Sequence, residues 1–248
     1  MAVSTVAVVT GATRGLGLAL AGQLLAGGAA VITLARTQSA ELADIAREHG
    51  ARLQQLQADL SSPAAIESAA GLMSAALPGG AERYLLLNNA GTVDPVALSE
   101  NLFDAESIQQ AFNLNVVSAM VLTAAFLRSS PGHADRRIVN ISSGAGRKPT
   151  PGWAAYCSTK AALDHYTRVL AAEHPGLRAV ALAPGVIDTP MQEGIRASDR
   201  RQFPDLDRFL QLHENNQLAS PEATASRILH YLASDRFGHE TLGDIRNY

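Results

Sequence analysis

Cysteine is almost absent from this chain of 248 residues. The single cysteine, Cys157, excludes an internal disulfide and a metal site made of several cysteines, and it fits a reducing compartment. We therefore expect a cytoplasmic protein with no bound metal. Cys157 itself is interpreted as a small buried side chain rather than as a nucleophile.

A surplus of charge of one sign is lacking as well. The formal net charge is -3, whereas nucleic acids and anionic membranes are bound mainly by clustered lysine and arginine. Partners of these two kinds are therefore not expected. Three short basic pairs are interpreted as solvated loops: Arg136-Arg137, Arg147-Lys148 and Arg200-Arg201.

Long apolar runs are not evident either. No stretch is expected to approach the ~18 residues that a membrane-spanning helix needs. The first apolar run, from Val3 to Val9, has no basic leader in front of it. We therefore expect neither a targeting signal nor a membrane anchor.

What the chain has is a regular alternation of short aliphatic runs with longer alanine- and leucine-rich segments of helical period. This alternation is typical of βαβ units around a parallel sheet. Strands are predicted near residues 3–9, 29–35, 52–57, 83–88, 136–141, 177–183 and 241–245, and helices near 15–26, 39–49, 63–77, 104–128, 153–173 and 221–234. We predict a single α/β domain over residues 1–248, a doubly wound (Rossmann) parallel sheet of six to seven strands with helices on both faces.

One stretch near the end of this pattern has no clear period. Residues 188–204, from Asp188 to Pro204, are rich in polar residues and contain two prolines, Pro190 and Pro204. Irregular segments beyond strand ends are where α/β enzymes usually place binding loops. The sequence therefore predicts a mobile substrate lid at about 188–204.

The first predicted strand runs into a glycine-rich turn. Gly11, Gly15 and Gly17 precede an apolar helix, so the backbone can approach a pyrophosphate closely and the helix N-terminus can bind it. The spacing is G-x-x-x-G-x-G rather than G-x-G-x-x-G. Simple chain reversal is the alternative, but the position at the first strand-to-helix junction favours phosphate binding.

The end of the second strand bears on the choice between NAD and NADP. It reads Leu34-Ala35-Arg36-Thr37 and has no carboxylate to bind the ribose hydroxyls of NAD. Arg36, with Arg14 from the glycine turn, suits the extra phosphate of NADP(H) through bidentate hydrogen bonds. The alternative is that both are surface arginines without a ligand.

Two later segments fall where ligands of parallel sheets bind. Asp59 follows the third strand, where it could accept from an adenine amine or cap the next helix. The turn Asn88-Asn89-Ala90-Gly91 closes the fourth strand. Such a turn is also ordinary loop chemistry, so only its register with the other segments favours a site.

A tyrosine and a lysine suggest the chemistry. Tyr156 and Lys160 are four residues apart on a predicted helix, which places both side chains on one face. The ammonium is expected to lower the pKa of the phenol toward working pH. Together they predict a proton donor beside a nucleotide.

Taken together, these motifs resemble those of the short-chain dehydrogenase/reductase family. The matches run in order from residue 10 to about 190: Thr10 to Gly17, Asn88 to Gly91, Asn115, Ser143, Tyr156-Cys157-Ser158-Thr159-Lys160 and Pro184-Gly185. The resemblance implies a catalytic set of Asn115, Ser143, Tyr156 and Lys160. In the family the catalytic serine precedes the tyrosine by thirteen residues, which favours Ser143 over Ser142. The family's asparagine binds a water that is linked to the lysine, and Asn115 is favoured over Asn113 for this role.

The resemblance also implies the residues that bind the cofactor. They are Gly11, Thr13, Arg14, Gly15, Leu16, Gly17, Arg36, Asp59, Leu60, Asn89, Ala90, Gly91, Tyr156, Lys160, Pro184, Gly185, Val186 and Thr189. Family members are commonly dimers or tetramers, so a homodimer or homotetramer is expected, paired through the helices near 104–128 and 153–173.

A narrower resemblance is to the sepiapterin reductase branch and its bacterial relatives that reduce vicinal diketones such as benzil. It implies an NADPH-dependent reductase of a small carbonyl compound, with Ser143, Trp153, Tyr156, Met191 and Asp244 at the substrate. Trp153 is expected to stack on a flat substrate. Two alternatives stay open: an NAD(P)-dependent alcohol or hydroxysteroid dehydrogenase of the same family, and an NADPH-binding sensor without catalysis.

Overall fold

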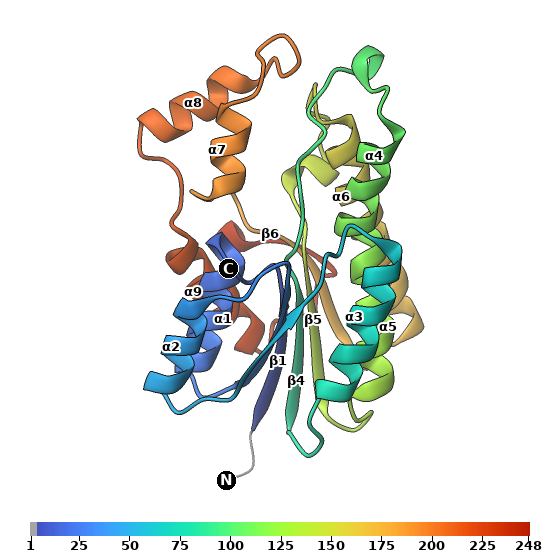
Figure 1. Cartoon of the computed structure of the whole chain (residues 1–248), viewed down its shortest axis with the longest axis vertical. Helices are drawn as coiled ribbons and strands as arrows, with labels where there is room; N and C mark the ends of the chain where they lie inside the picture. The colour runs from blue at the N-terminus through green and yellow to red at the C-terminus, as the bar shows by residue number, and fades with distance from the viewer. Residues whose placement is uncertain (1–3) are drawn as a thin grey trace.

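The computed structural model describes residues 4–248, so Val3 of the predicted first strand lies outside the described residues. Its centre is a seven-stranded parallel sheet in the order β3-β2-β1-β4-β5-β6-β7 (Figure 1). The strands are β1 Thr5–Thr10, β2 Ala30–Ala35, β3 Leu53–Gln57, β4 Arg83–Asn88, β5 Asp135–Ile141, β6 Arg178–Ala183 and β7 Leu242–Asp244. The predicted doubly wound sheet is confirmed.

Nine helices among residues 4–248 connect and cover these strands. They are α1 Gly15–Ala26, α2 Ala40–Glu48, α3 Pro63–Ala76, α4 Ala105–Phe112, α5 Ser118–Ser129, α6 Ala154–Glu173, α7 Pro190–Arg196, α8 Leu206–Glu214 and α9 Pro221–Ala233. Short helical turns add η1 Ser99–Asn101, η2 Asn113–Val117, η3 Gly144–Gly146 and η4 Ile245–Asn247.

Two hydrophobic cores hold the helices to the sheet. Apolar side chains alternate to the two faces of each strand, so each face has its own core. On one face α1, α2 and α9 cover the sheet, with Leu20 and Leu25 of α1 fully buried, and on the other α3, α5 and α6 do so, with Phe126 fully buried (Figure 1). Each such side chain contributes ~1.5–3 kcal/mol when it is removed from water.

The strand order fixes where a ligand can bind. From β1 the chain proceeds to β2 and β3 on one side, then returns to β4, β5 and β6 on the other. The loops after β1 and β4 therefore part in opposite directions and leave a crevice at the carboxyl ends of the strands.

The long helix predicted near 104–128 is interrupted. A π-helical turn, η2, separates α4 from α5 within one helical run, Ala105–Ser129. This run of 25 residues is long and apolar enough to cross a membrane by composition, contrary to the expectation that no stretch approaches that length. Half of its most apolar window is buried within the molecule, where α5 packs on α3.

The segment predicted to be irregular contains a helix. Pro190 begins α7 at its first position, where a missing N–H costs nothing, and α8 follows at residues 206–214. Both helices stand above the carboxyl ends of the strands (Figure 1). The prediction of an irregular segment is therefore wrong for residues 190–196.

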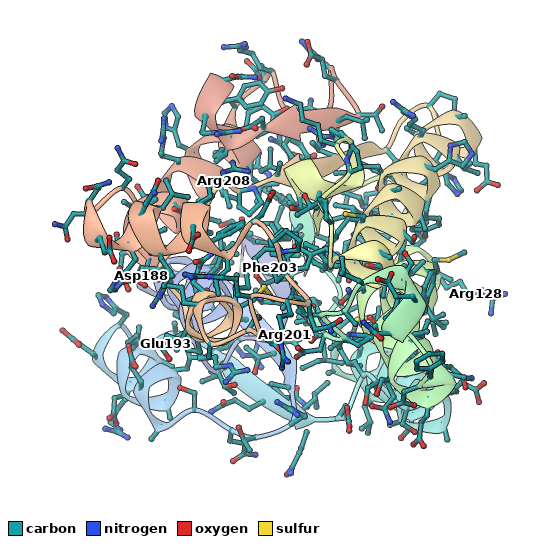
Figure 2. The ribbon with its side chains drawn as sticks, turned by 90° about the horizontal axis from the view of Figure 1, so that it is seen from above. Arg128, Asp188, Glu193, Arg201, Phe203 and Arg208 are labelled. Carbon is teal, nitrogen blue, oxygen red and sulfur yellow. The ribbon has the colours of Figure 1, made fainter. Side chains whose placement is uncertain are left out.

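A third, smaller hydrophobic cluster lies under these two helices. The third cluster consists of Val93, Ala145, Trp153, Tyr156, Ile195, Phe203, Leu206 and Phe209. Seen from above the carboxyl ends, Phe203 lies toward the centre of the molecule, while Arg128 projects outward (Figure 2). The α7–α8 segment thus has its own apolar attachment to the start of α6.

Candidate active site

A cleft of about 840 Å³ runs along the carboxyl ends of the strands. It brings together the glycine turn, the ends of β2, β4 and β5, the start of α6 and the segment after β6. Every residue predicted to contact the cofactor lines this cleft, and so do Ser143, Trp153 and Met191. Asn115 and Asp244 are not part of its lining.

The glycine turn leaves no space for side chains. A Cβ on Gly17 would lie 2.2 Å from the carbonyl oxygen of Gly11, and a Cβ on Gly11, whose φ is +66°, would lie 2.9 Å from the Cα of Ala90. The Asn89 amide donates to the carbonyls of Thr10 and Gly11 at 2.9 and 3.2 Å, which ties the turn to the end of β4.

The start of α1 faces the cleft from this turn. Arg14 stands at the N-cap with no side-chain hydrogen bond to the helix, so the first N–H groups of α1 are not capped by it. A backbone cradle that a Cβ would fill, next to a helix N-terminus, fits a phosphate group. The predicted phosphate site therefore has the required geometry.

Arg36 and Asp59 lie together at the far end of the cleft. Arg36 and, in the glycine turn, Arg14 are both exposed, and neither forms an ion pair within residues 4–248. Hydrogen bonds from the backbone and hydroxyl of Ser61 lower the pKa of Asp59, with a smaller contribution from the charge of Arg36. Asp59 makes this turn rather than the N-cap of α3, which is Ser62.

Asn115 stands in the π-helical turn, behind the cleft wall. Its amide oxygen accepts from the Thr92 N–H at 2.8 Å, and its nitrogen donates to the Thr92 carbonyl and the Thr159 hydroxyl. A Cβ on Gly91 would lie 3.1 Å from the Asn115 oxygen and 3.6 Å from Lys160 Nζ. The structure thus brings Asn115, Gly91 and Lys160 together, and π-helical turns often occur at functional sites.

Asn113 differs from Asn115 in its contacts. Its amide donates to the Ser61 carbonyl at 2.9 Å, in the turn that also contains Asp59.

Tyr156, Lys160 and Ser143 meet at the centre of the cleft. Lys160 Nζ lies 5.7 Å from the centre of the Tyr156 ring and donates to the Ile141 carbonyl at 2.8 Å. Burial raises the pKa of Tyr156, and a hydrogen bond with Ser143 opposes this only in part. The predicted lowering of the phenol pKa is therefore wrong, because desolvation outweighs the stabilisation of the phenolate.

Burial also disfavours the charged form of Lys160. Burial lowers the pKa of Lys160 to about 8, against an opposing effect of Asp164. Only 4% of the residue is exposed. Lys160 is thus a buried cation that can lose its proton just above neutral pH.

Trp153 walls the cleft but is already packed. Its ring stacks on Phe203 with centres 4.8 Å apart and planes at 15°, meets Phe209 at 5.2 Å, and lies edge-on to Tyr156 at 5.4 Å. The structure therefore places Phe203 where a flat substrate was expected to stack.

Asp244 lies at the end of β7, with its carboxylate engaged elsewhere. It pairs with Arg246 at 2.6 Å and accepts from the Arg246 N–H, and these hydrogen bonds lower the pKa of its carboxyl. The predicted contact between Asp244 and a substrate is not provided by this arrangement.

Cys157 is half-buried against the third cluster. Arg147 is exposed in a turn, as expected, and also pairs with the buried Asp164 at 3.0 Å. Arg137, expected in a solvated loop, is instead only 3% exposed and pairs with Asp135.

Several cleft residues were not predicted. Gln192 and Ile195 of α7, and Phe209 of α8, all line it. The apolar spacing of Phe203, Leu206 and Phe209, three residues apart, is the signal that could have indicated an amphipathic turn here.

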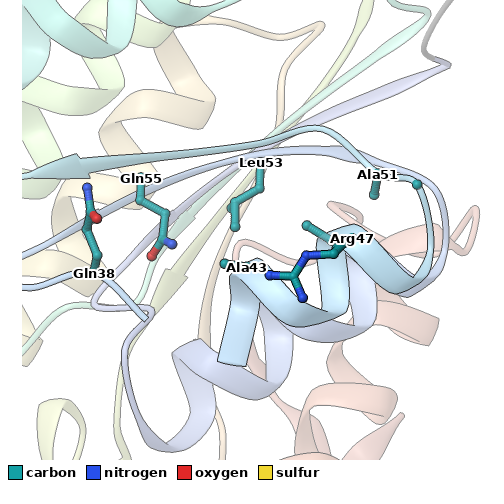
Figure 3. Close-up of a pocket in the computed structure, with 8 residues that line it drawn as sticks. Gln38, Ala43, Arg47, Ala51, Leu53 and Gln55 are labelled. Atoms are coloured by element: carbon teal, nitrogen blue, oxygen red, sulfur yellow. The ribbon is translucent and has the colours of Figure 1, made fainter. Parts of the chain in front are cut away.

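A second hollow of about 570 Å³ lies between α2 and β3, at the edge of the sheet (Figure 3). Its lining includes Gln38, Gln55 and Arg47, of which Arg47 pairs with Asp44. It contains no nucleophile or acid for catalysis. Within residues 4–248 no group of His, Cys, Asp and Glu side chains could hold a metal ion.

Comparisons with known proteins agree with this geometry. A family model described as short chain dehydrogenase matches residues 5–200. The chain is 35% identical over 237 residues to a benzil reductase ((S)-benzoin forming) of Bacillus cereus, covering 93% of this chain and 94% of that one. It is 36% identical over 247 residues to the sepiapterin reductase of Meriones unguiculatus, covering 94% and 92%.

Solved structures give the same picture. The KRED1-Pglu enzyme superposes with a TM-score of 0.80 at 33% identity, covering 94% of this chain and 98% of that one. A short chain dehydrogenase from Burkholderia cenocepacia, solved in complex with NADP, has a TM-score of 0.74 at 27% identity, covering 97% and 95%.

Proposed function

The chain belongs to the short-chain dehydrogenase family, and we propose that it is an NADPH-dependent reductase of small ketones, preferring a vicinal dicarbonyl or sepiapterin-like substrate. The observation that carries this is the meeting of Tyr156, Ser143 and Lys160 in the cleft that also contains the glycine cradle. A proton donor and a phosphate site in one cleft are what carbonyl reduction by a nicotinamide requires.

The cleft fits NADPH at its phosphate-binding end. The glycine turn and the start of α1 would hold the pyrophosphate, and Arg14 and Arg36 would bind the additional phosphate. Asp59 and Leu60 would lie at the adenine, and Pro184, Gly185, Val186 and Thr189 beside the nicotinamide. When bound, NADPH supplies the hydride.

Tyr156 would donate the proton that the new alkoxide needs. Its raised pKa keeps the phenol protonated at neutral pH, which suits donation in the direction of reduction. Ser143 would hold the substrate oxygen, and Lys160, charged below about pH 8, would stabilise the phenolate that remains. Asn115 would position Lys160 by fixing the wall formed by Gly91 and Thr92.

The substrate class is inferred from the cleft wall and the relatives. Trp153, Ile195 and Phe209 provide an apolar wall close to Tyr156, which suits a ketone flanked by flat or aromatic groups. The relatives are named benzil reductase and sepiapterin reductase. Both names indicate ketones with a neighbouring carbonyl or conjugated ring.

Turnover assays test this directly. The purified protein is incubated with NADPH or NADH and with sepiapterin, benzil or phenylpropanedione, and cofactor oxidation is followed at 340 nm. We expect turnover with NADPH on at least one of the three. Inactivity on all three contradicts the substrate assignment, and faster oxidation of a secondary alcohol with NAD would favour the alcohol dehydrogenase alternative.

The proton donor is tested with Tyr156→Phe, which removes the hydroxyl and keeps the ring. We expect the rate to fall by a factor of ~1000 or more, while NADPH binding, measured by fluorescence titration, is unchanged. A variant that keeps its rate contradicts the role of Tyr156. Binding of NADPH without oxidation by the unmodified protein on a broad carbonyl panel would favour a sensor.

We also propose that the protein forms a homodimer or homotetramer. Met120 of α5 and Val169 of α6 are exposed apolar residues on the two helices expected to pair. Sedimentation velocity at micromolar concentration tests this, and a monomer contradicts it.

A further inference from the structure

A buried carboxylate lies one turn beyond Lys160 on α6. Asp164 follows Lys160 by four residues, as Lys160 follows Tyr156, so the three share one face of the helix. Both Lys160 and Asp164 are 4% exposed. No direct ion pair joins them among the described residues, so any attraction acts across one turn of helix.

Asp164 also connects α6 to the segment that contains Ser143. The Ser142 hydroxyl donates to one carboxylate oxygen of Asp164 at 2.5 Å, and Arg147 donates to the other at 3.0 Å. Ser142 and Arg147 lie on either side of Ser143 and the turn η3. One carboxylate therefore holds both ends of the segment that places Ser143 against Tyr156.

The turn η3 is in direct contact with the backbone of α6 at Lys160. A Cβ on Gly146 would lie 2.8 Å from the carbonyl carbon of Lys160 and 2.9 Å from its oxygen. This close approach carries Arg147 to Asp164. The same guanidinium donates to the carbonyls of Ala181 in β6 and Gly243 in β7.

We propose that Asp164 is a positioning residue for the reaction, which holds Ser143 against α6 and keeps the neighbouring Lys160 ammonium charged, and that Arg147 limits this second effect. The proposal rests on the proposed function for its meaning in catalysis. Its electrostatic part concerns the protein without cofactor and can be tested separately.

The charges around Lys160 determine the sign of the expected effects. Asp164 and Tyr156 lie on the same face of α6 as Lys160, and Arg147, at the end of η3, reaches Asp164. The end of β5 offers the Ile141 carbonyl, η2 offers the Asn115 amide, and the loop after β4 brings Asp94 to the same cleft. Removing the Asp164 charge should make the Lys160 ammonium less stable, whereas removing the Arg147 charge should make it more stable.

The chain offers a direct readout because it contains two lysines, Lys148 and Lys160. Protein labelled with [13Cε]lysine gives two NMR signals, and Lys148→Arg identifies the one from Lys160. In the unmodified protein we expect Lys160 to titrate with a pKa of about 8. Asp164→Asn should lower this midpoint by about one pH unit, and Arg147→Gln should raise it.

The matched control is Asp135→Asn. Asp135 also pairs with arginines, Arg83 and Arg137, but at the other end of β5. Its loss should reduce stability without moving the Lys160 titration. A shift of equal size in this control would overturn the proposal.

The decisive outcome is the direction of the two shifts. Shifts of the same sign, or an unmoved titration, overturn the proposal. If Asp164→Asn does not fold, the Lys160 titration in Arg147→Gln is the deciding measurement. An unmoved midpoint in that variant then overturns the proposal.

Activity supplies the second readout. With NADPH and an accepted ketone, the alkaline decline of kcat should move to lower pH in Asp164→Asn, while the KM for NADPH changes by less than about twofold. An unmoved decline overturns the positioning role of Asp164. Opposite lysine shifts in a protein that reduces no ketone would leave the electrostatic assignment intact and contradict the proposed function instead.

Discussion

At the glycine turn the wall of the cleft is backbone packed against backbone, whereas beneath α7 and α8 it is side chain stacked on side chain. Gly11 and Gly17 admit no Cβ, and the hydrogen bonds there run from the Asn89 amide to main-chain carbonyls. The other end is held by the stack of Trp153 on Phe203 and by the third cluster. The wall at the glycine turn can form because glycine has no side chain. The wall beneath α7 and α8 forms because aromatic and aliphatic side chains pack against one another.

The largest expected effect tests the backbone wall. Gly17→Ala would place a Cβ 2.2 Å from the Gly11 carbonyl oxygen, so the turn must open and NADPH affinity should fall by ~1000-fold, or ~4 kcal/mol. Gly71→Ala is the control, because nothing lies within 4 Å of its Cβ on α3. It should raise stability by ~0.5–1 kcal/mol. Equal cofactor binding by both variants would show that the cradle is not tightly packed.

Lys160, where the two regions meet, offers the next largest effect. Its pKa is about 8 in the folded protein, below the ordinary 10.5, so the unfolded chain binds more protons between these values and stability rises with pH there. Below pH 8 the folded protein buries a charged lysine at a cost of up to ~3 kcal/mol. We therefore expect inactive Lys160→Met to be more stable than the unmodified protein at pH 7.

Urea unfolding at pH 7 and pH 10 measures this difference. The advantage of Lys160→Met should shrink between pH 8 and 10.5 as the folded protein loses the proton of Lys160. Lys148→Met, at an exposed position, is the control and should change little. A variant that is less stable at both pH values contradicts the assignment of Lys160 as a costly buried cation.

A substitution at Arg36 tests whether a side chain at the glycine-turn end of the cleft distinguishes NADPH from NADH or contributes equally to the binding of both. Arg36→Asp should reduce the preference for NADPH over NADH by ~30-fold, about 2 kcal/mol, through loss of a charge-assisted hydrogen bond and added repulsion. Affinities for both cofactors are measured by fluorescence titration. Arg52→Asp, exposed and outside the cleft lining, should leave the preference unchanged. Equal weakening of both cofactors would show that Arg36 does not read the phosphate.

The smallest expected effect concerns the side-chain wall. A Cβ on Gly152 would lie 2.3 Å from the Gln202 carbonyl oxygen and 3.1 Å from the Cα of Phe203. Gly152→Ala should therefore displace the α7–α8 segment and lower kcat/KM for the ketone by ~10-fold, about 1.4 kcal/mol, without weakening NADPH.

Gly28→Ala separates this effect from backbone strain. Gly28 has φ +82°, close to the +86° of Gly152, but nothing lies within 4 Å of its Cβ. Both variants bear the cost of an unusual φ, and only the first contacts Phe203. Equal losses of kcat/KM would show that the contact is irrelevant.

The same contrast explains what could be predicted from the sequence. The strand and helix positions of the sheet follow from periodicity, and α1 was predicted with its observed bounds, 15–26. The glycine turn was recognisable because the close backbone packing there requires glycine, and glycine can be identified directly in the sequence. The cleft lining includes every predicted cofactor residue.

The parts that could not be predicted depend on tertiary packing. The stack that covers Trp153 needs Phe203, fifty residues away. Burial, not spacing, raises the pKa of Tyr156, and the pair of Arg147 with Asp164 needs the close approach at Gly146. A local pattern carries no information on these contacts, because the partners come from distant segments.

The π-helical turn at Asn113–Val117 has a consequence for how such a chain can change over time. Each residue added to or removed from a regular helix rotates all that follows by about 100°. By absorbing one residue, η2 lets α4 keep its face toward α6 while α5 keeps its own toward α3. The two halves of this helical run can therefore diverge separately: substitutions on the face of α4 that packs on α6 need no compensation in the packing of α5 on α3.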